Sequence, residues 1–172
     1  AHERMAAYGV ERTILVQAAD NAAETQHLLR VADGDPRVAG VIGWVPLGQP
    51  SITTAMLASR DRRWVGVRSL IHDRPNDDWI LGCDEGLAAV AQAGLPLDYV
   101  TNGPDALRHV PGIAARHPNL RIVIDHLGKP PIGGTSKELA EWRDLLAACT
   151  ENPQVYAKLS GLYGPAGNLT GW

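Results

Sequence analysis

The sequence predicts an α/β fold built around a parallel sheet, and two observations support this prediction. Short runs rich in Val and Ile alternate along the chain with amphipathic segments, and the runs are apolar at almost every position, as in strands buried on both faces. No Gly/Ser linker or shift in composition interrupts the alternation, so we expect residues 1–172 to form one domain. The predicted strands are Thr13–Gln17, Val41–Val45, Val65–Ile71, Leu95–Val100, Arg121–Asp125 and Val155–Gly161.

The segments between these runs carry the start and stop signals of helices. Asn21 is predicted to cap the helix that follows the first strand, and Ser136 to cap the helix before the last strand. Pro104 suits the first turn of a helix that extends to about His117. Because Pro111 lies inside that helix and has no amide hydrogen, we expect it to kink or split the helix.

Right-handed connections between successive parallel strands give either a closed barrel or an open, doubly wound sheet. Neither of the phosphate-binding patterns GxGxxG and GxxxxGK[ST] follows any predicted strand. This absence disfavours a nucleotide-binding open sheet. The chain of 172 residues is also shorter than a complete (β/α)8 barrel, which typically has roughly 250 residues.

Composition and charge favour a small-molecule partner. The chain has 16 basic and 19 acidic residues without charged runs, so it offers no basic stripe for nucleic acid and no polybasic patch for a membrane. Cys83 and Cys149 belong to no metal-binding or disulfide pattern and are interpreted as buried thiols of a cytoplasmic protein. No apolar run approaches the length of about 20 residues that a membrane span requires.

In a parallel barrel, reactive groups lie at the carboxyl ends of the strands, and the Asp125-His126 pair follows such an end. The imidazole of His126 can ligate a divalent metal or transfer a proton, because its pKa lies near neutrality. The alternative is a histidine that only hydrogen-bonds to a backbone carbonyl. For Asp125 the two interpretations are a carboxylate that supports a catalytic neighbour and a purely structural acceptor.

Isolated polar residues inside other apolar runs point to one shared polar cavity, formed by Arg68, Asp98, Lys158 and Ser160 together with His126. Arg68 needs a partner, because a buried unpaired guanidinium is costly. That partner is either a substrate carboxylate or polyol, or an internal aspartate. His72 either reaches the same cavity or is a solvated loop residue. The sequence has no GxSxG pattern, so a Ser-His-Asp hydrolase is not supported.

Four segments carry a resemblance to a known family: Gly9–Gln17, Gly66–Arg68, Ile122–Pro130 with DHLGKP, and Val155–Leu162 with KLSGL. They resemble the amidohydrolase-related family that hydrolyses sugar lactones and pyrone-dicarboxylate lactones. The resemblance covers essentially the whole chain. It implies an incomplete (β/α)8 TIM barrel in which the predicted strands correspond to strands two through seven.

The resemblance also implies roles for individual residues. His126 matches the active-site histidine that ends the sixth barrel strand, and it would bind a divalent metal such as zinc if one is used, although some relatives are thought to work without a metal. Arg68 is expected to face the substrate, with weaker cases for Asp98 and Lys158. The sequence departs from the family pattern because it contains no HxH pair and no eighth strand with its aspartate.

The sequence therefore predicts a hydrolase of carbohydrate metabolism that opens a sugar-acid lactone. One alternative is a metal-dependent decarboxylase or C–C hydrolase of the same superfamily. The other is a truncated, inactive binding module, which the absent HxH pair favours. An open barrel would expose two strand edges, so we expect the isolated chain to be poorly soluble or a homo-oligomer, and inactive.

Overall fold

The computed structural model describes residues 2–71, 74 and 76–162, and it contains all six predicted strands. The strands are β1 (Thr13–Val16), β2 (Val38–Gly43), β3 (Trp64–Leu70), β4 (Leu97–Val100), β5 (Ile122–Ile124) and β6 (Val155–Ala157). The α-helices are α1 (His2–Ala7), α2 (Ala22–Gly34), α3 (Pro50–Ala58), α4 (Asp84–Gln92), α5 (Val110–Arg116) and α6 (Ser136–Thr150). Short 3-10 helices are η2 (Asp77–Cys83), η3 (Pro104–His109) and η4 (Asp125–Gly128).

The order of the strands in the sheet decides between the two predicted architectures. The six strands are parallel and lie in the sequential order β1-β2-β3-β4-β5-β6. A doubly wound sheet reverses its strand order at a switch point, and this sheet does not. The described residues therefore form consecutive units of a barrel-type fold.

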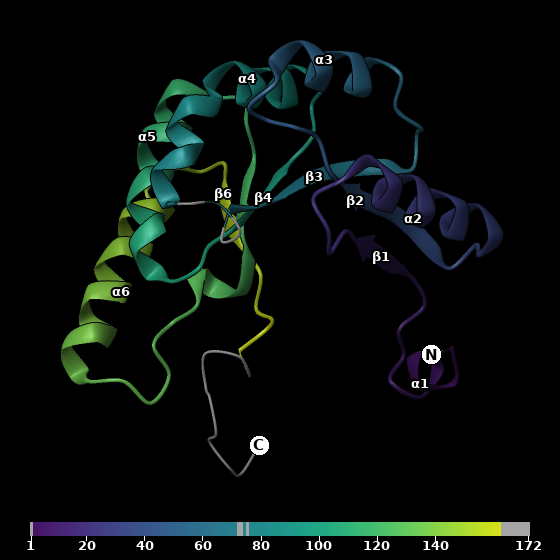
Figure 1. Ribbon diagram of the computed structural model, residues 1–172. Coiled ribbons are helices and arrows are strands. Elements are labelled where there is room, and N and C mark those ends of the chain that lie inside the picture. The colour runs from purple at the N-terminus through teal and green to yellow at the C-terminus, as the bar shows by residue number, and fades with distance from the viewer. Residues whose placement is uncertain (1, 72–73, 75, 163–172) are drawn as a thin grey trace.

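The helices α2 to α6 form an arc along the outer side of the curved sheet (Figure 1). The core lies between the strands and this arc, where Leu97, Tyr99 and Ile122 are almost completely buried. The hydroxyl of Tyr99 donates to the carbonyl oxygen of Ala106 at 3.0 Å, so the one polar atom of this large side chain is satisfied within the core. Because side chains alternate between the two faces of a strand, burial of these apolar residues against the helices turns the residues between them towards the inside of the barrel.

The predicted helix signals are confirmed with one correction. The side chain of Asn21 accepts from the amide of Glu24 and caps α2. The cap of α6 is Thr135 rather than Ser136, because Thr135 and Glu138 form a reciprocal capping box and Ser136 becomes the first helical residue. The helix that contains Pro111 is split, as expected, into η3 and α5.

The last strand is shorter than predicted, because β6 ends at Ala157 and the chain then bends away from the ladder. The amide of Lys158 still donates to Ile124 at 2.9 Å, but its carbonyl oxygen instead accepts from Leu127 at 3.1 Å. Gly161 then takes a left-handed conformation, with φ of 61°. Residues 158–161 therefore lie beside the loop that follows β5, where the candidate site is found.

The two edge strands expose apolar side chains. Ile14 on β1 is 51% exposed and Tyr156 on β6 is 55% exposed. These side chains belong to strands that have only one neighbour among the described strands. Among the described residues, no helix has both the length and the hydropathy needed to cross a membrane.

Candidate active site

Four charged side chains meet on the inner face of the sheet, and we call them the charged network: Arg68, Asp98, Asp125 and Lys158. The register places Arg68 on β3 opposite Asp98 on β4. Nε of Arg68 donates to Asp125 at 3.0 Å, and Nη1 donates to the carbonyl oxygen of Gln17 at 2.7 Å. The ammonium of Lys158 contacts Asp98 and lies 2.8 Å from Oδ1 of Asp125. The network therefore joins β3 and β4 to the residues that directly follow β5 and β6.

Burial controls the electrostatics of the charged network. The side chains of Asp98 and Asp125 are only 2% exposed, whereas that of Lys158 is 29% exposed. Burial raises the pKa of Asp98 to about 6, and the hydrogen bond from Lys158 opposes this shift without cancelling it. Two cations thus compensate two carboxylates that could not remain charged alone.

Three of the predicted site residues, Arg68, Asp98 and Lys158, are thus brought together, and Arg68 has one of the two kinds of partner proposed for it. Its guanidinium pairs with Asp125 inside the protein, and the guanidinium is 14% exposed. Asp125 forms ion pairs with both cations of the network. Lys158 keeps the most accessible surface of the four and is the member best placed to contact a bound molecule.

The loop after β5 is a rare left-handed turn formed by residues 126–129. His126, Leu127, Gly128 and Lys129 have φ values of 55°, 53°, 69° and 54°. This conformation costs about 1–2 kcal/mol for each residue with a side chain. Strain of this kind persists only where the surroundings hold it, and it is concentrated at functional sites. In the described part of the chain, no other residue with a side chain has a positive φ.

The turn places the ring of His126 beside the end of β6. Nδ1 of His126 lies 3.0 Å from Oγ of Ser160. A Cβ on Gly161 would lie 2.2 Å from Nδ1 of the same ring, so only glycine permits this approach. His126 also lines an open cavity of about 520 Å³ that lies between the loops after β4, β5 and β6. The cavity is lined by Asn102, Gly103, Pro104, His126, Lys129, Pro130, Pro131 and Gly161.

A second constellation, around Asp20, was not predicted from the sequence. The carboxylate of Asp20 accepts from the amide of Leu70 at 3.1 Å, from Oγ of Ser69 at 3.4 Å and from Arg74 at 2.6 Å. Arg74 also stacks over the ring of Trp79, with 4.3 Å to its centroid. The position of Asp20, in the loop that follows β1, was the available signal. His72, the other predicted residue of this region, lies outside the described residues.

We tested whether the described residues fit the divalent metal that the resemblance implies. Within residues 2–71, 74 and 76–162, no three His, Cys, Asp or Glu side chains are grouped so that they could hold a metal ion. His126 could supply one ligand, but the nearby Asp125 already accepts a hydrogen bond from Arg68 and forms ion pairs with Arg68 and Lys158. These residues do not provide a metal centre among themselves, so no reaction step is assigned to a metal.

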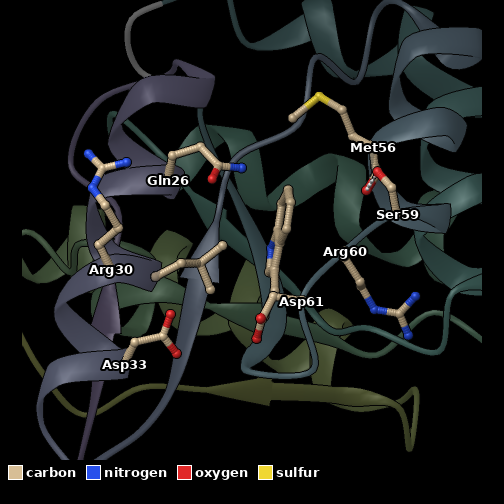
Figure 2. Close-up of a pocket in the computed structure, with 9 residues that line it drawn as sticks. Gln26, Arg30, Asp33, Met56, Ser59, Arg60 and Asp61 are labelled. Atoms are coloured by element: carbon tan, nitrogen blue, oxygen red, sulfur yellow. Dashed lines mark hydrogen bonds between the residues drawn. The ribbon is translucent and has the colours of Figure 1, made fainter.

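A different cavity, of about 330 Å³, lies between α2 and α3 on the outer side of the sheet (Figure 2). The guanidinium of Arg60 donates to the carbonyl oxygens of Leu57 and Ala93, and Asp33 lies 3.6 Å from Arg63. These charged groups already have structural partners. The cavity is also near the amino end of β3, opposite to the end where barrel chemistry occurs. Its lining comprises Gln26, Leu29, Arg30, Asp33, Met56, Ser59, Arg60, Asp61 and Trp64.

The sequential parallel sheet and the histidine at its carboxyl edge agree with the family comparison. The family model described as Amidohydrolase matches residues 1–169. The chain therefore belongs to the Amidohydrolase family, as the DHLGKP and KLSGL segments indicated.

The chain is also similar to individual proteins and solved structures. It is 38% identical over 168 residues to an L-fucono-1,5-lactonase of Burkholderia ambifaria, covering 95% of this chain and 56% of the relative. The crystal structure of a Burkholderia multivorans amidohydrolase with bound zinc is 30% identical, with a TM-score of 0.88 over 96% of this chain and 59% of that one. A probable 2-pyrone-4,6-dicarboxylic acid hydrolase of Acinetobacter baumannii shares the fold, with 18% identity and a TM-score of 0.70 over 95% and 60% of the two chains.

The chain thus spans little more than half the length of these relatives. Over that length the barrel-type fold predicted from the sequence is confirmed.

Proposed function

We propose that the native protein hydrolyses the lactone ring of a sugar acid, with L-fucono-1,5-lactone as the first substrate to test. The observation that carries this proposal is His126, whose ring lines a cavity at the carboxyl edge of the sheet. The identity of 38% to an L-fucono-1,5-lactonase supports the choice of substrate. A cavity of about 520 Å³ has the volume for a six-carbon lactone and its attacking water.

In the proposed reaction, water adds to the lactone carbonyl carbon, the ring C–O bond breaks, and a hydroxy acid is released. Negative charge develops on the carbonyl oxygen as water adds. His126 is positioned to stabilise this oxygen through Nε2, because Nδ1 is already engaged by Ser160. Stabilisation of this kind by one donor is worth roughly 10²–10³ in rate.

The charged network supports this chemistry from the inner face of the sheet. We assign substrate contact to Lys158, whose ammonium is the most exposed of the four groups. The proposed role of Arg68 and Asp98 is to hold the network in place, because their side chains are engaged with other residues of the chain. Cys83 and Cys149 are both free and buried, which supports a cytoplasmic protein.

The proposal is tested by measuring lactone hydrolysis in the native protein and in a His126→Asn variant. Asparagine is chosen because it tolerates the left-handed backbone that residue 126 adopts. We expect kcat/KM to fall by about 10²–10³, the value of the donor that is lost. His27→Ala is the matched control, because His27 is exposed on α2 and its loss should leave the rate unchanged.

Two results would contradict the proposal. One is a His126→Asn variant with the activity of the parent protein. The other is a native protein that opens none of a panel of sugar-acid lactones but releases carbon dioxide from carboxylated substrates. Metal analysis of the same preparation would show whether such a decarboxylating protein carries zinc.

A further inference from the structure

We infer that Ser160 is a positioning residue whose hydroxyl donates to Nδ1 of His126, so that the imidazole carries its proton on Nε2 and presents that nitrogen to the substrate. This inference rests on the proposed function for the role of Nε2 and for its kinetic test. The tautomer of His126 can be measured whether or not a lactone is the substrate.

The contact between the two side chains is direct. Oγ of Ser160 lies 3.0 Å from Nδ1 of His126, and both groups are partly buried. A neutral imidazole carries its proton on one nitrogen, and a hydrogen bond at Nδ1 determines what Nε2 can do. A serine hydroxyl can donate to Nδ1 or accept from it. The donor role follows from the proposed function, because it leaves on Nε2 the proton that stabilisation of the carbonyl oxygen requires. In either role, a hydroxyl at this distance limits rotation of the ring.

The segment that carries Ser160 holds three consecutive residues of the neighbouring loop. The ammonium of Lys158 lies 2.8 Å from Oδ1 of Asp125, and the carbonyl oxygen of Lys158 accepts from the amide of Leu127 at 3.1 Å. Ser160 holds His126, which lies between these two residues. One strand end thus fixes the carboxylate, the imidazole and the backbone of a strained turn.

Gly161 completes this arrangement. A Cβ at position 161 would lie 2.2 Å from Nδ1 and 2.5 Å from Cγ of His126, closer than any van der Waals contact permits. The ring therefore packs directly against the backbone of residue 161. The Lys158–Gly161 segment leaves the imidazole little freedom to turn, and the hydroxyl of Ser160 supplies the polar part of the constraint.

A nucleophilic serine is the competing interpretation of the same contact, since a serine beside a histidine can be activated for attack. In such a site a third group orients the base through its other nitrogen. Here the carboxylate of Asp125 is instead bound to Arg68 and Lys158. The geometry accordingly favours a serine that positions the histidine over one that attacks the substrate.

The kinetic test compares Ser160→Ala, Ser160→Thr and the native protein. Removing the hydroxyl should lower kcat by roughly 10–100-fold, the usual effect of losing a group that orients an active-site histidine, with little change in KM. Threonine keeps the hydroxyl and should restore most of the rate. Ser59→Ala, which removes a hydrogen-bonded hydroxyl at the end of α3, is the matched control and should be silent.

The spectroscopic test uses the native protein with ¹⁵N-labelled histidine, at a pH where the imidazoles are neutral. We expect two well-separated nitrogen resonances for His126, assigned by their loss in His126→Asn. In Ser160→Ala these resonances should move towards each other as the two tautomers mix. Unfolding temperatures measured alongside distinguish loss of positioning from loss of structure.

Three outcomes would overturn the inference. Nitrogen resonances that do not change in Ser160→Ala would show that the hydroxyl does not set the tautomer. Full kcat in that variant would show that the contact has no catalytic effect. A covalent acyl adduct on Ser160, detected by mass spectrometry after rapid quenching with substrate, would identify a nucleophile instead.

Discussion

On the outer face of the sheet, Leu97 is buried beneath helices among other apolar side chains, whereas on the inner face its neighbour Asp98 is equally buried among charges. The outer face requires only side chains of suitable volume, which many sequences could provide. The inner face requires particular partners, because each buried charge depends on another. Substitutions on the two faces of one strand are therefore limited by different requirements, by side-chain volume on the outer face and by charge pairing on the inner face.

The largest effect is expected when the inner face loses a cation. In Lys158→Ala, the buried carboxylates of Asp98 and Asp125 lose a partner that they share. We expect the free energy of unfolding to fall by about 4 kcal/mol, as is typical when one member of a buried ion pair is removed. Urea denaturation of the native protein and the variant measures this loss. A change below about 1 kcal/mol would show that the network is solvated, contrary to the comparison.

A cavity on the outer face should cost somewhat less. Leu97→Ala removes a side chain that is 1% exposed and leaves a gap between β4 and the helices. We expect a loss of about 3 kcal/mol in the same denaturation experiment. Val31→Ala on α2 is the control, because Val31 is 41% exposed and its truncation should have little effect. Equal losses in both variants would contradict the packing described for the outer face.

The pH dependence of stability separates the two faces in a third way. The pKa of Asp98 is about 6 in the folded protein, above its ordinary value of 3.8, so the folded state takes up a proton first as the pH falls. The contribution of Asp98 to stability therefore increases as the pH is lowered from 6 to 4, by roughly 2 kcal/mol. It is smallest above pH 6, where the buried carboxylate is charged.

Asp98→Asn should remove this component when unfolding is followed at several pH values. The exposed Asp144 on α6 provides the control, since Asp144→Asn should leave the pH profile unchanged. If Asp98→Asn had the same dependence of stability on pH as the native protein, a group other than Asp98 would be responsible for the proton uptake.

The smallest effect is expected for an ion pair of the same chemistry in solvent. Nζ of Lys137 lies 3.6 Å from Glu141, and the two side chains are 84% and 60% exposed. Lys137→Ala should change the free energy of unfolding by less than about 0.5 kcal/mol. Its difference from Lys158→Ala measures what burial adds to one lysine–carboxylate contact. If Lys137→Ala lowered the free energy of unfolding as much as Lys158→Ala does, burial would not explain the large effect at Lys158.

The pattern of apolar residues predicted all six strands, because buried parallel strands need continuous apolar runs. The split at Pro111 was predictable for a local reason, since proline cannot continue a helix. The strand order was not decided by periodicity, because a barrel and a doubly wound sheet use the same units. The cap of α6 was displaced by one residue, since Thr135 and Ser136 carry equivalent hydroxyls and only Thr135 is three residues before Glu138.

The charged network was predictable in its membership but not in its pairing. A polar residue inside an apolar run signals that a partner exists, and Arg68, Asp98 and Lys158 were identified in this way. Which aspartate each cation meets depends on strand register and on the path of the chain after β6, which the sequence does not reveal. The left-handed conformation of His126 was also hidden, because only Gly128 in that turn suggests a positive φ.

The sequential order of the strands has a consequence for how the chain folds. Each strand pairs with the next one along the sequence, so the ladder can grow by successive addition of neighbouring βα units without waiting for distant segments to meet. Folding rates rise when contacts are close in sequence. The charged network is the exception, because Lys158 and Asp98 are 60 residues apart. We therefore expect the site to assemble late, after the sheet that supports it.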